Sequence, residues 1–340
     1  MTRIQATTDA TGTTTSMTMV EALNLALHQN MAADENVLCM GEDIGVNGGV
    51  FRVTKGLRDA FGEDRVLDTP LAECGIVGTA VGMAIYGLKP IAEIQFSGFT
   101  MQAFDQIEQN MARYRNRSRN RYTVPMVLRT PYGGGIRAVE HHSESREAYW
   151  AHTPGLKVVI PSGPRNARAL LHTSINDPDP VVFYEPKAVY RAFREDVPDA
   201  PEGMPLGKAH VAREGGDVTM IAYGAMMRPV LESADDLKDL HGISAEVIDL
   251  LSIAPMDTET LAASVAKTGR CVIVHEGPRT CGIAAEIIAR LNEAVFECLE
   301  APIRRVTGYD THFPYFQCEQ HYPPDADTIS LAVQETVAWE

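Results

Sequence analysis

The chain carries no excess of positive charge. Its 340 residues include 30 Lys and Arg against 45 Asp and Glu, which gives a formal net charge of −15. Nucleic acids and anionic membranes would repel such a protein at long range, so neither is expected as a partner. A basic protein partner is favoured instead.

Long hydrophobic runs are also missing. No apolar segment approaches the roughly 20 residues that span a bilayer. The first residues, MTRIQATTDATGTTTS, contain one Arg and no apolar stretch, so they resemble neither a secretory signal nor an Arg-rich transit peptide. We expect residues 1–16 to form a disordered tail, and the protein to be soluble and cytoplasmic.

The six cysteines form no CxxC pair and no regular spacing, which is typical of reduced thiols, and we expect most of them to be small core residues. The chain has no P-loop, GxSxG or HExxH motif, which argues against nucleotide hydrolysis, esterase and zinc-protease chemistry. The run GGGIRA fits GxGxxA, but it does not follow a strand directly and no apolar helix follows it, so NAD binding is disfavoured.

What the sequence does contain is an alternation of helical and β-type apolar patterns. Val20, Leu23, Leu27 and Met31 have helical spacing, and short runs such as NVLCM, IAEIQF and PVVFYE read as buried strands. Strands separated by helices predict an α/β fold with two parallel-sheet domains. The predicted boundaries are a first domain at 17–190, a proline-rich linker at 191–210 and a second domain at 211–340.

Glu73 stands between a proline turn and a helix of small residues, in DTPLAECGIVG. One interpretation is a capping acid, because helix N-termini favour negative charge. The four-residue spacing of Gly78 and Gly82 predicts close approach of another helix, which would bury the start of this one. A carboxylate there could exchange a proton near neutral pH.

Two further strand ends carry groups that could act on a ligand. Gln95 and Phe99 offer an amide and a ring that suit a flat heterocycle, although a surface Gln and a core Phe are equally consistent. His141 and His142 follow a flexible YGGG run; adjacent side chains diverge in regular structure, so one functional histidine is favoured over a shared metal. The alternative is a helix that starts at Ser143 and leaves a surface His.

Two other clusters have simpler interpretations. His275 and Glu276 end the strand CVIVHE, where they most simply close a domain interface. Ser174, Asp177 and Asp179 surround a turn between a helix and a strand, and this turn could also hold a monovalent cation such as K⁺.

Taken together, several motifs in order identify a resemblance that covers nearly the whole chain from Met17. It rests on GEDIGVNGGVFR, DTPLAECGIVG, AEIQFSGF, HHSES, PGLKVVIP, YEPK, EVIDL, KTGRCVIVHE and LEAPIRRVTGYD. These resemble the β-subunits of the thiamine-diphosphate-dependent component of 2-oxo acid dehydrogenase complexes. The resemblance implies a pyrimidine-binding domain followed by a transketolase-type C-terminal domain.

The resemblance also implies roles for single residues. Glu73 would bond the pyrimidine ring of thiamine diphosphate and favour the tautomer that removes the thiazolium proton, Phe99 would stack on that ring, and Gln95 would be its polar neighbour. His142 matches the histidine that faces the reacting carbon and acts in acyl transfer to lipoamide. Oxidative decarboxylation of a 2-oxo acid is the implied reaction.

The implied assembly is an α₂β₂ heterotetramer that docks on the subunit-binding and lipoyl domains of an acyltransferase. The GDG signature for diphosphate and Mg²⁺ is absent, so Mg²⁺ would be bound mainly by the α-subunit and the lone chain should be inactive. A non-catalytic organising subunit and a self-sufficient transketolase-like enzyme are the alternatives. QFSGF slightly favours pyruvate over branched-chain 2-oxo acids. HSES replaces the common HSQS, and DTHFP, with His312, replaces DTPFP.

Overall fold

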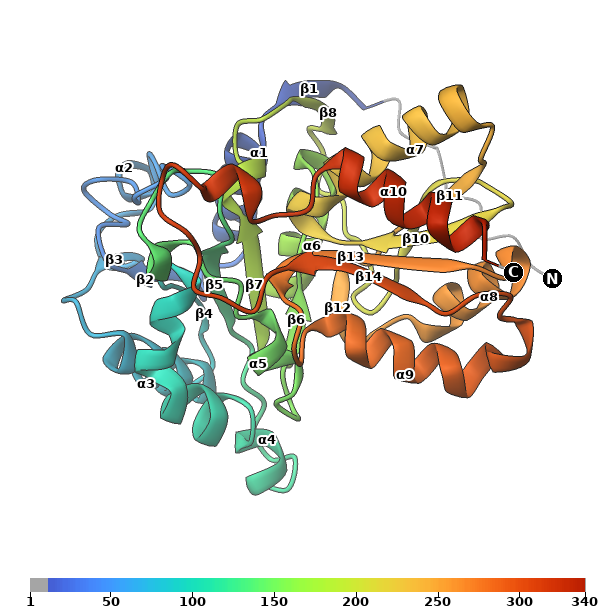
Figure 1. Ribbon diagram of the computed structural model, residues 1–340. Coiled ribbons are helices and arrows are strands. Elements are labelled where there is room, and N and C mark those ends of the chain that lie inside the picture. The colour runs from blue at the N-terminus through green and yellow to red at the C-terminus, as the bar shows by residue number, and fades with distance from the viewer. Residues whose placement is uncertain (1–11, 340) are drawn as a thin grey trace.

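A computed structural model describes residues 12–339, and it places two α/β sheets side by side (Figure 1). The first sheet has seven strands, parallel except at one edge. In spatial order they are β12 (Ser252–Ala254), β6 (Lys157–Val159), β7 (Val181–Pro186), β5 (Val127–Tyr132), β4 (Lys89–Glu93), β2 (Val37–Gly41) and β3 (Val66–Asp68). Six of these match apolar runs that the sequence presents as strands, because strands buried on both faces read as continuous hydrophobic stretches.

The second sheet has five strands. Its order is β14 (Arg304–Gly308), β13 (Cys271–Pro278), β10 (Val218–Ala222), β11 (Ala245–Asp249) and β9 (His210–Arg213), with β9 antiparallel to its neighbour. The predicted α/β class with two mainly parallel sheets is therefore confirmed.

Helices cover both faces of each sheet. On the first sheet α1 (Met19–Ala33) packs with α6 (Pro164–Ile175) on one face, whereas α3 (Glu73–Ile85) and α5 (Glu147–Ala151) lie on the other. On the second sheet the corresponding helices are α7 (Met227–His241) and α10 (Ala326–Val337) against α8 (Thr258–Thr268) and α9 (Ile283–Val295). Two short helices, α2 (Leu57–Phe61) and α4 (Tyr114–Arg117), lie in connecting segments. None of these helices combines the length and hydrophobicity needed to cross a membrane.

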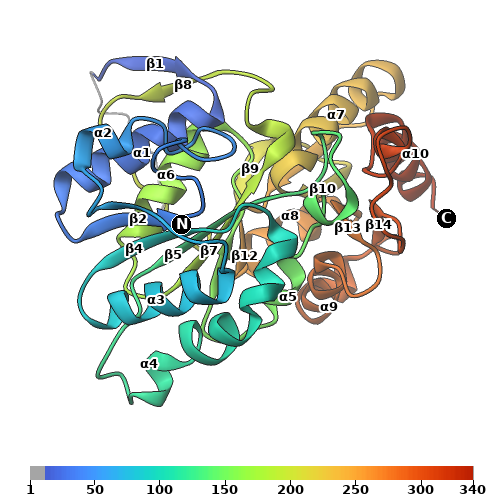
Figure 2. The same ribbon diagram turned by 90° about the vertical axis from the view of Figure 1, so that its left-hand side faces the viewer.

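The start of the chain differs from the sequence-based expectation. Thr14–Met17 forms strand β1, which pairs antiparallel with β8 (Glu195–Pro198) inside the predicted linker (Figure 2). The prediction of a disordered tail is thus wrong for Thr14–Ser16, because backbone pairing with a distant segment replaces water as their hydrogen-bond partner. Residues 1–11 of that predicted tail lie outside the described part of the chain.

The cysteines also depart from expectation. All six are free thiols, but only Cys39 and Cys271 are buried. The expectation that most are small core residues is wrong, since Cys74, Cys281, Cys298 and Cys318 are exposed.

Candidate active site

The predicted site residues lie at one edge of the first sheet. Strands β2, β3, β4 and β5 are parallel, so the loops that follow them emerge on the same side. Glu73 follows β3, Gln95 and Phe99 follow β4, and His142 follows β5. A second acid, Glu42, follows β2 directly.

Glu73 occupies the first position of α3 and is only 9% exposed. The helix has no side-chain cap at its preceding residue, and the Glu73 carboxylate has no hydrogen-bond partner among residues 12–339. The helix dipole still favours its charge, but a capping hydrogen bond does not occupy it. The carboxylate is therefore available to a ligand.

Glu42 lies close enough to Glu73 for their charges to interact. Burial, followed by the charges of Glu73 and Asp43, raises the pKa of the Glu42 carboxyl. Its Oε1 atom is buried without a hydrogen-bond partner in the described structure. A buried acid whose charged form is disfavoured, next to a second acid, is a common arrangement at sites of proton transfer.

Gln95 supports this acidic segment and does not point to open solvent. Its Nε2 atom donates to Oδ2 of Asp43 at 3.2 Å and approaches the backbone carbonyl oxygen of Glu42 at 3.5 Å. Of the two interpretations offered by the sequence, the plain surface Gln does not fit these contacts.

His142 packs among aromatic rings. Its ring centroid lies 4.2 Å from that of Phe96 and 5.3 Å from that of Phe99, with edge-to-face geometry in both cases. Its Nδ1 atom is buried and has no hydrogen-bond partner among the residues that the structure describes. Burial and the neighbouring charges of His141 and Lys187 lower its pKa, so the ring is neutral at pH 7. A neutral imidazole packed against aromatic rings can accept a proton and transfer it to another group.

Two expectations for this loop are corrected. The rings of His141 and His142 do not diverge: their centroids are 4.3 Å apart, because Glu140–His142 is a single 3₁₀ turn and not an extended regular element. No helix starts at Ser143; α5 begins at Glu147. Among the described residues, no group of three or more His, Cys, Asp or Glu side chains is placed to hold a metal ion.

The YGGG run before the histidines is held by tight packing. A Cβ atom added at Gly133 would lie 1.7 Å from Oε1 of Glu276, and one at Gly134 would lie 2.4 Å from the ring of Phe313. Gly133 also has a φ of +78°, in the left-handed region that favours glycine. The glycines therefore bring the histidine loop directly against the second half of the chain.

Glu276 lies at an interface, as the sequence-based interpretation of this strand end expects. Its Oε1 atom accepts a hydrogen bond from the Ser145 hydroxyl at 3.2 Å, and the neighbouring His275 side chain is fully buried. Burial and the charge of Glu147 raise the pKa of Glu276 to about 7. This strand end closes the interface between the two sheets.

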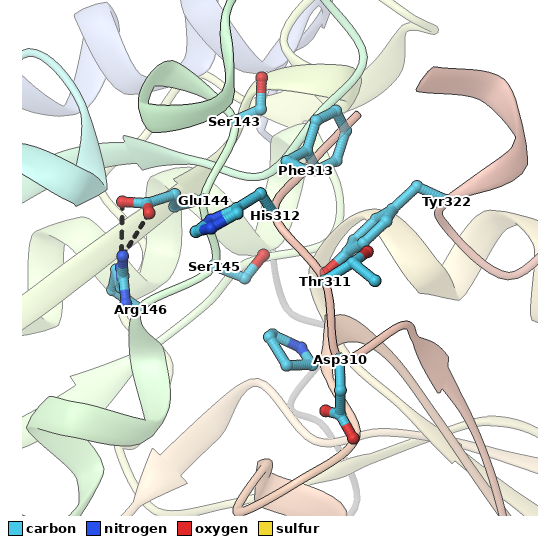
Figure 3. Close-up of a pocket in the computed structure, with 10 residues that line it drawn as sticks. Ser143, Glu144, Ser145, Arg146, Asp310, Thr311, His312, Phe313 and Tyr322 are labelled. Atoms are coloured by element: carbon cyan, nitrogen blue, oxygen red, sulfur yellow. Dashed lines mark hydrogen bonds and ion pairs between the residues drawn. The ribbon is translucent and has the colours of Figure 1, made fainter. Parts of the chain in front are cut away.

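A cavity of about 400 Å³ adjoins the histidine loop (Figure 3). Its walls come from the loop, the end of β13 and the segment after β14: Ser143, Glu144, Ser145, Arg146, Pro278, Asp310, Thr311, His312, Phe313 and Tyr322. Glu144 pairs with Arg146, and the close-up draws His312 among the other lining residues (Figure 3). Both departures from the family motifs, Glu144 and His312, thus line the same cavity.

The candidate cation turn is already occupied by protein cations. The Lys157 ammonium lies 2.6 Å from Oδ1 of Asp177 and 3.6 Å from Oδ2 of Asp179, which also pairs with Arg115. The Ser174 hydroxyl donates to the carbonyl oxygen of Leu170. A monovalent cation would compete with Lys157 for these carboxylates.

Three buried neighbours of the site, Glu42, Phe96 and Lys187, were not predicted from the sequence. The only available signal for Lys187 is its place directly after an apolar strand, where a basic residue needs a specific partner.

Comparisons with known proteins agree with this arrangement. Residues 15–192 match the family "Transketolase, pyrimidine binding domain", and residues 207–329 match "Transketolase, C-terminal domain". A 3-methyl-2-oxobutanoate dehydrogenase subunit beta of Mycobacterium tuberculosis is 50% identical over 95% of this chain and 93% of its own. Two pyruvate dehydrogenase E1 component subunits beta are also 50% identical: one from Acholeplasma laidlawii, over 94% of this chain and 97% of its own, and one from Staphylococcus epidermidis, over 94% and 98%.

A solved structure described as a split gene transketolase, an inactive beta4 tetramer, superposes with a TM-score of 0.76. It covers 96% of this chain and 99% of its own at 22% identity, which supports the fold.

Proposed function

Because this chain belongs to the family of 2-oxo acid dehydrogenase β-subunits, we propose that it supplies half of a thiamine-diphosphate-dependent site for oxidative decarboxylation of a 2-oxo acid. The acyl product would pass to lipoamide. The convergence of Glu73, Phe99 and His142 at one sheet edge carries this proposal.

The residues at this edge fit the cofactor. When bound, thiamine diphosphate supplies the electron sink that decarboxylation needs. Within residues 12–339 the carboxylate of Glu73 has no competing hydrogen bond, and it would exchange a proton with a nitrogen of the cofactor's pyrimidine ring. Phe99 would hold that ring by stacking, and Gln95 would keep the Glu42–Asp43 segment in place. Neutral His142 would move a proton during acyl transfer.

The missing parts of the site would come from an α-subunit in an α₂β₂ heterotetramer, which would also hold most of the Mg²⁺ coordination. The subunit-binding and lipoyl domains of an acyltransferase are the proposed partners in the larger complex, and the charge of −15 supports docking on a basic domain. Potassium at the Asp177–Asp179 turn stays a prediction, and it would have to displace the Lys157 ammonium.

The proposed substrate is pyruvate, because the Phe in QFSGF favours pyruvate over branched-chain 2-oxo acids. Named relatives for pyruvate and for 3-methyl-2-oxobutanoate share the same 50% identity, so overall similarity does not separate the two. Decarboxylation of both acids should be assayed with thiamine diphosphate and Mg²⁺, with and without the α-subunit. Activity of the lone chain would support a self-sufficient transketolase-like enzyme, and inactivity of the reconstituted pair would support a purely organising subunit.

Glu73→Gln tests the central residue. The variant should assemble normally yet lose about 10²-fold or more in turnover, because the amide cannot exchange the proton. Glu63→Gln is the matched control, since Glu63 has a 75% exposed side chain and makes only a surface ion pair with Arg58. Normal turnover of Glu73→Gln would reduce Glu73 to a favourable charge at a helix start.

A further inference from the structure

Lys187 is a buried cation that contacts the backbone of His142. It follows β7 directly, in a 3₁₀ turn at Lys187–Val189, and is 4% exposed. Its ammonium donates a hydrogen bond to the backbone carbonyl oxygen of His142 at 2.5 Å. The same ammonium lies 5.4 Å from the centroid of the Phe96 ring, the ring that packs closest to His142. The Lys187 side chain thus contacts both the backbone of His142 and the Phe96 ring that packs against it.

The charges that act on Lys187 come from the second half of the chain. Glu276 in β13 and Glu319 in a 3₁₀ turn at Glu319–His321 both favour its protonated form, whereas burial opposes that form and lowers the Lys187 pKa to about 7. The two acids also bind the histidine loop themselves. Glu319 accepts a hydrogen bond from the backbone N–H of Gly135, and Glu276 accepts one from Ser145. Loop, lysine and acids therefore form one connected polar unit.

We propose that Lys187 is a positioning residue that fixes His142 for acyl transfer and links its placement to the second α/β unit. The proposal rests on the proposed function, because it acts through the role given there to His142. It needs no contact between Lys187 and substrate or cofactor.

The arrangement has a consequence for pH dependence. The charged groups that act on His142 are His141 and Lys187, which lower its pKa, and Glu140, which raises it, while burial lowers it further. Phe96 and Phe99 pack against it without charge. Removing the Lys187 charge should therefore raise the His142 pKa. The ring would become protonated at a higher pH, so the acid limb of the acyl-transfer profile should move upward.

The test is a double-mutant cycle in the assembled α/β enzyme with His142→Ala, Lys187→Met and the double variant. Acylation of a lipoyl domain and decarboxylation with an artificial electron acceptor are measured separately across pH. Lys187→Met should lower acylation about 10-fold or more and decarboxylation less, because small misplacements of a reacting group carry large kinetic costs. In the His142→Ala background the same change should cost much less, since the two residues act as a unit. Lys187→Arg should restore part of the rate.

Lys267→Met is the matched control. Lys267 pairs with Glu246, a buried acid on β11, so its loss also leaves a buried carboxylate without its cation, but at a distance from the histidine loop. It should reduce thermal stability without a selective loss of acylation. If Lys187→Met does not assemble, Lys187→Gln replaces it, because it keeps a donor and removes the charge. That variant should move the acid limb upward while keeping most of the rate at pH 8.

The outcomes separate the two hypotheses. Additive losses from His142→Ala and Lys187→Met, or an unmoved acid limb in the Lys187 variants, would overturn the positioning role alone. Normal acylation by His142→Ala would instead contradict the role of His142 in the proposed function.

Discussion

At the scale of single residues, Arg129 on β5 is a buried cation that pairs with two buried carboxylates. Its guanidinium pairs with Glu185 through Nε at 2.7 Å and Nη2 at 2.9 Å, and with Glu93 through Nη1 at 2.7 Å. Tyr190 donates to the same Glu185 carboxylate. All three charged side chains are buried, so each depends on the others to offset its desolvation.

Arg129→Met should lower the free energy of unfolding by about 3–5 kcal/mol, because it leaves two carboxylates buried without a cation. Chemical denaturation monitored by circular dichroism measures the loss. Arg304→Met is the control: Arg304 pairs with Glu335 at the surface, and its loss should cost about 1 kcal/mol or less. Equal effects of the two substitutions would contradict the importance assigned to the buried network.

The residues that could be predicted from sequence are those beside recognisable strand ends. Glu73, Phe99 and His142 stand in polar loops after apolar runs, and such loops carry ligand sites in parallel sheets. Lys187 and Arg129 could not be predicted, because their roles depend on partners 36–56 residues away in the chain, which no local pattern reveals.

At the scale of elements, α3 has two different faces. Ile76, Val77, Ala80, Val81 and Ala84 are buried against the sheet, whereas Cys74, Gly75, Thr79 and Gly82 are exposed. Gly78 meets Gln106 of a neighbouring π-helical segment, with 3.2 Å between an added Cβ and Oε1, which confirms close packing at one of the two predicted glycines. Figure 2 shows α3 on the outer side of the first sheet. Its small exposed residues suit a closely approaching partner.

Gly82→Leu tests that face. A Cβ atom at Gly82 would meet no atom within 4 Å, and leucine is a better helix former than glycine, so the lone chain should be at least as stable as the parent. Assembly with the α-subunit should weaken, because the larger side chain would hold the partner away. Thermal unfolding and analytical ultracentrifugation measure the two effects. Gly216→Leu, at another open glycine in the second half, should leave assembly unchanged. Normal assembly of Gly82→Leu would exclude this face as the contact.

The helices and central strands were predictable because burial gives them strong periodic patterns. In the second half the sequence predicts helices near 226–241, 257–267 and 282–297, and the structure has α7, α8 and α9 there. Strands β1, β8, β9, β12 and β14 were not predicted. All five lie at sheet edges, and all except β14 are three or four residues long and pair antiparallel, so their formation depends on distant partners more than on their own composition.

At the scale of the whole molecule, the two sheets do not form separate cores. Strand β12, which follows β11 in the chain, adds to the edge of the first sheet by pairing with β6. Each of the two buried apolar clusters contains residues of both sheets. The Tyr223 hydroxyl of the second half donates to the buried Glu147 of the first at 2.8 Å. These links predict that the two halves stabilise one another.

Expression of residues 1–205 and 206–340 as separate chains tests this dependence. Each half alone should show no cooperative thermal transition, because separation exposes an edge of the first sheet and leaves the Glu147 carboxylate without its hydroxyl partner. Co-expression should restore a complex that unfolds near the temperature of the intact chain. In that complex Lys187, Glu276 and Glu319 should again contact the histidine loop. Differential scanning calorimetry of each half and of the complex measures the transitions. If residues 206–340 alone unfold at the temperature of the intact chain, the two sheets are independent. The contacts of Glu276 and Glu319 with the histidine loop would then not stabilise either half.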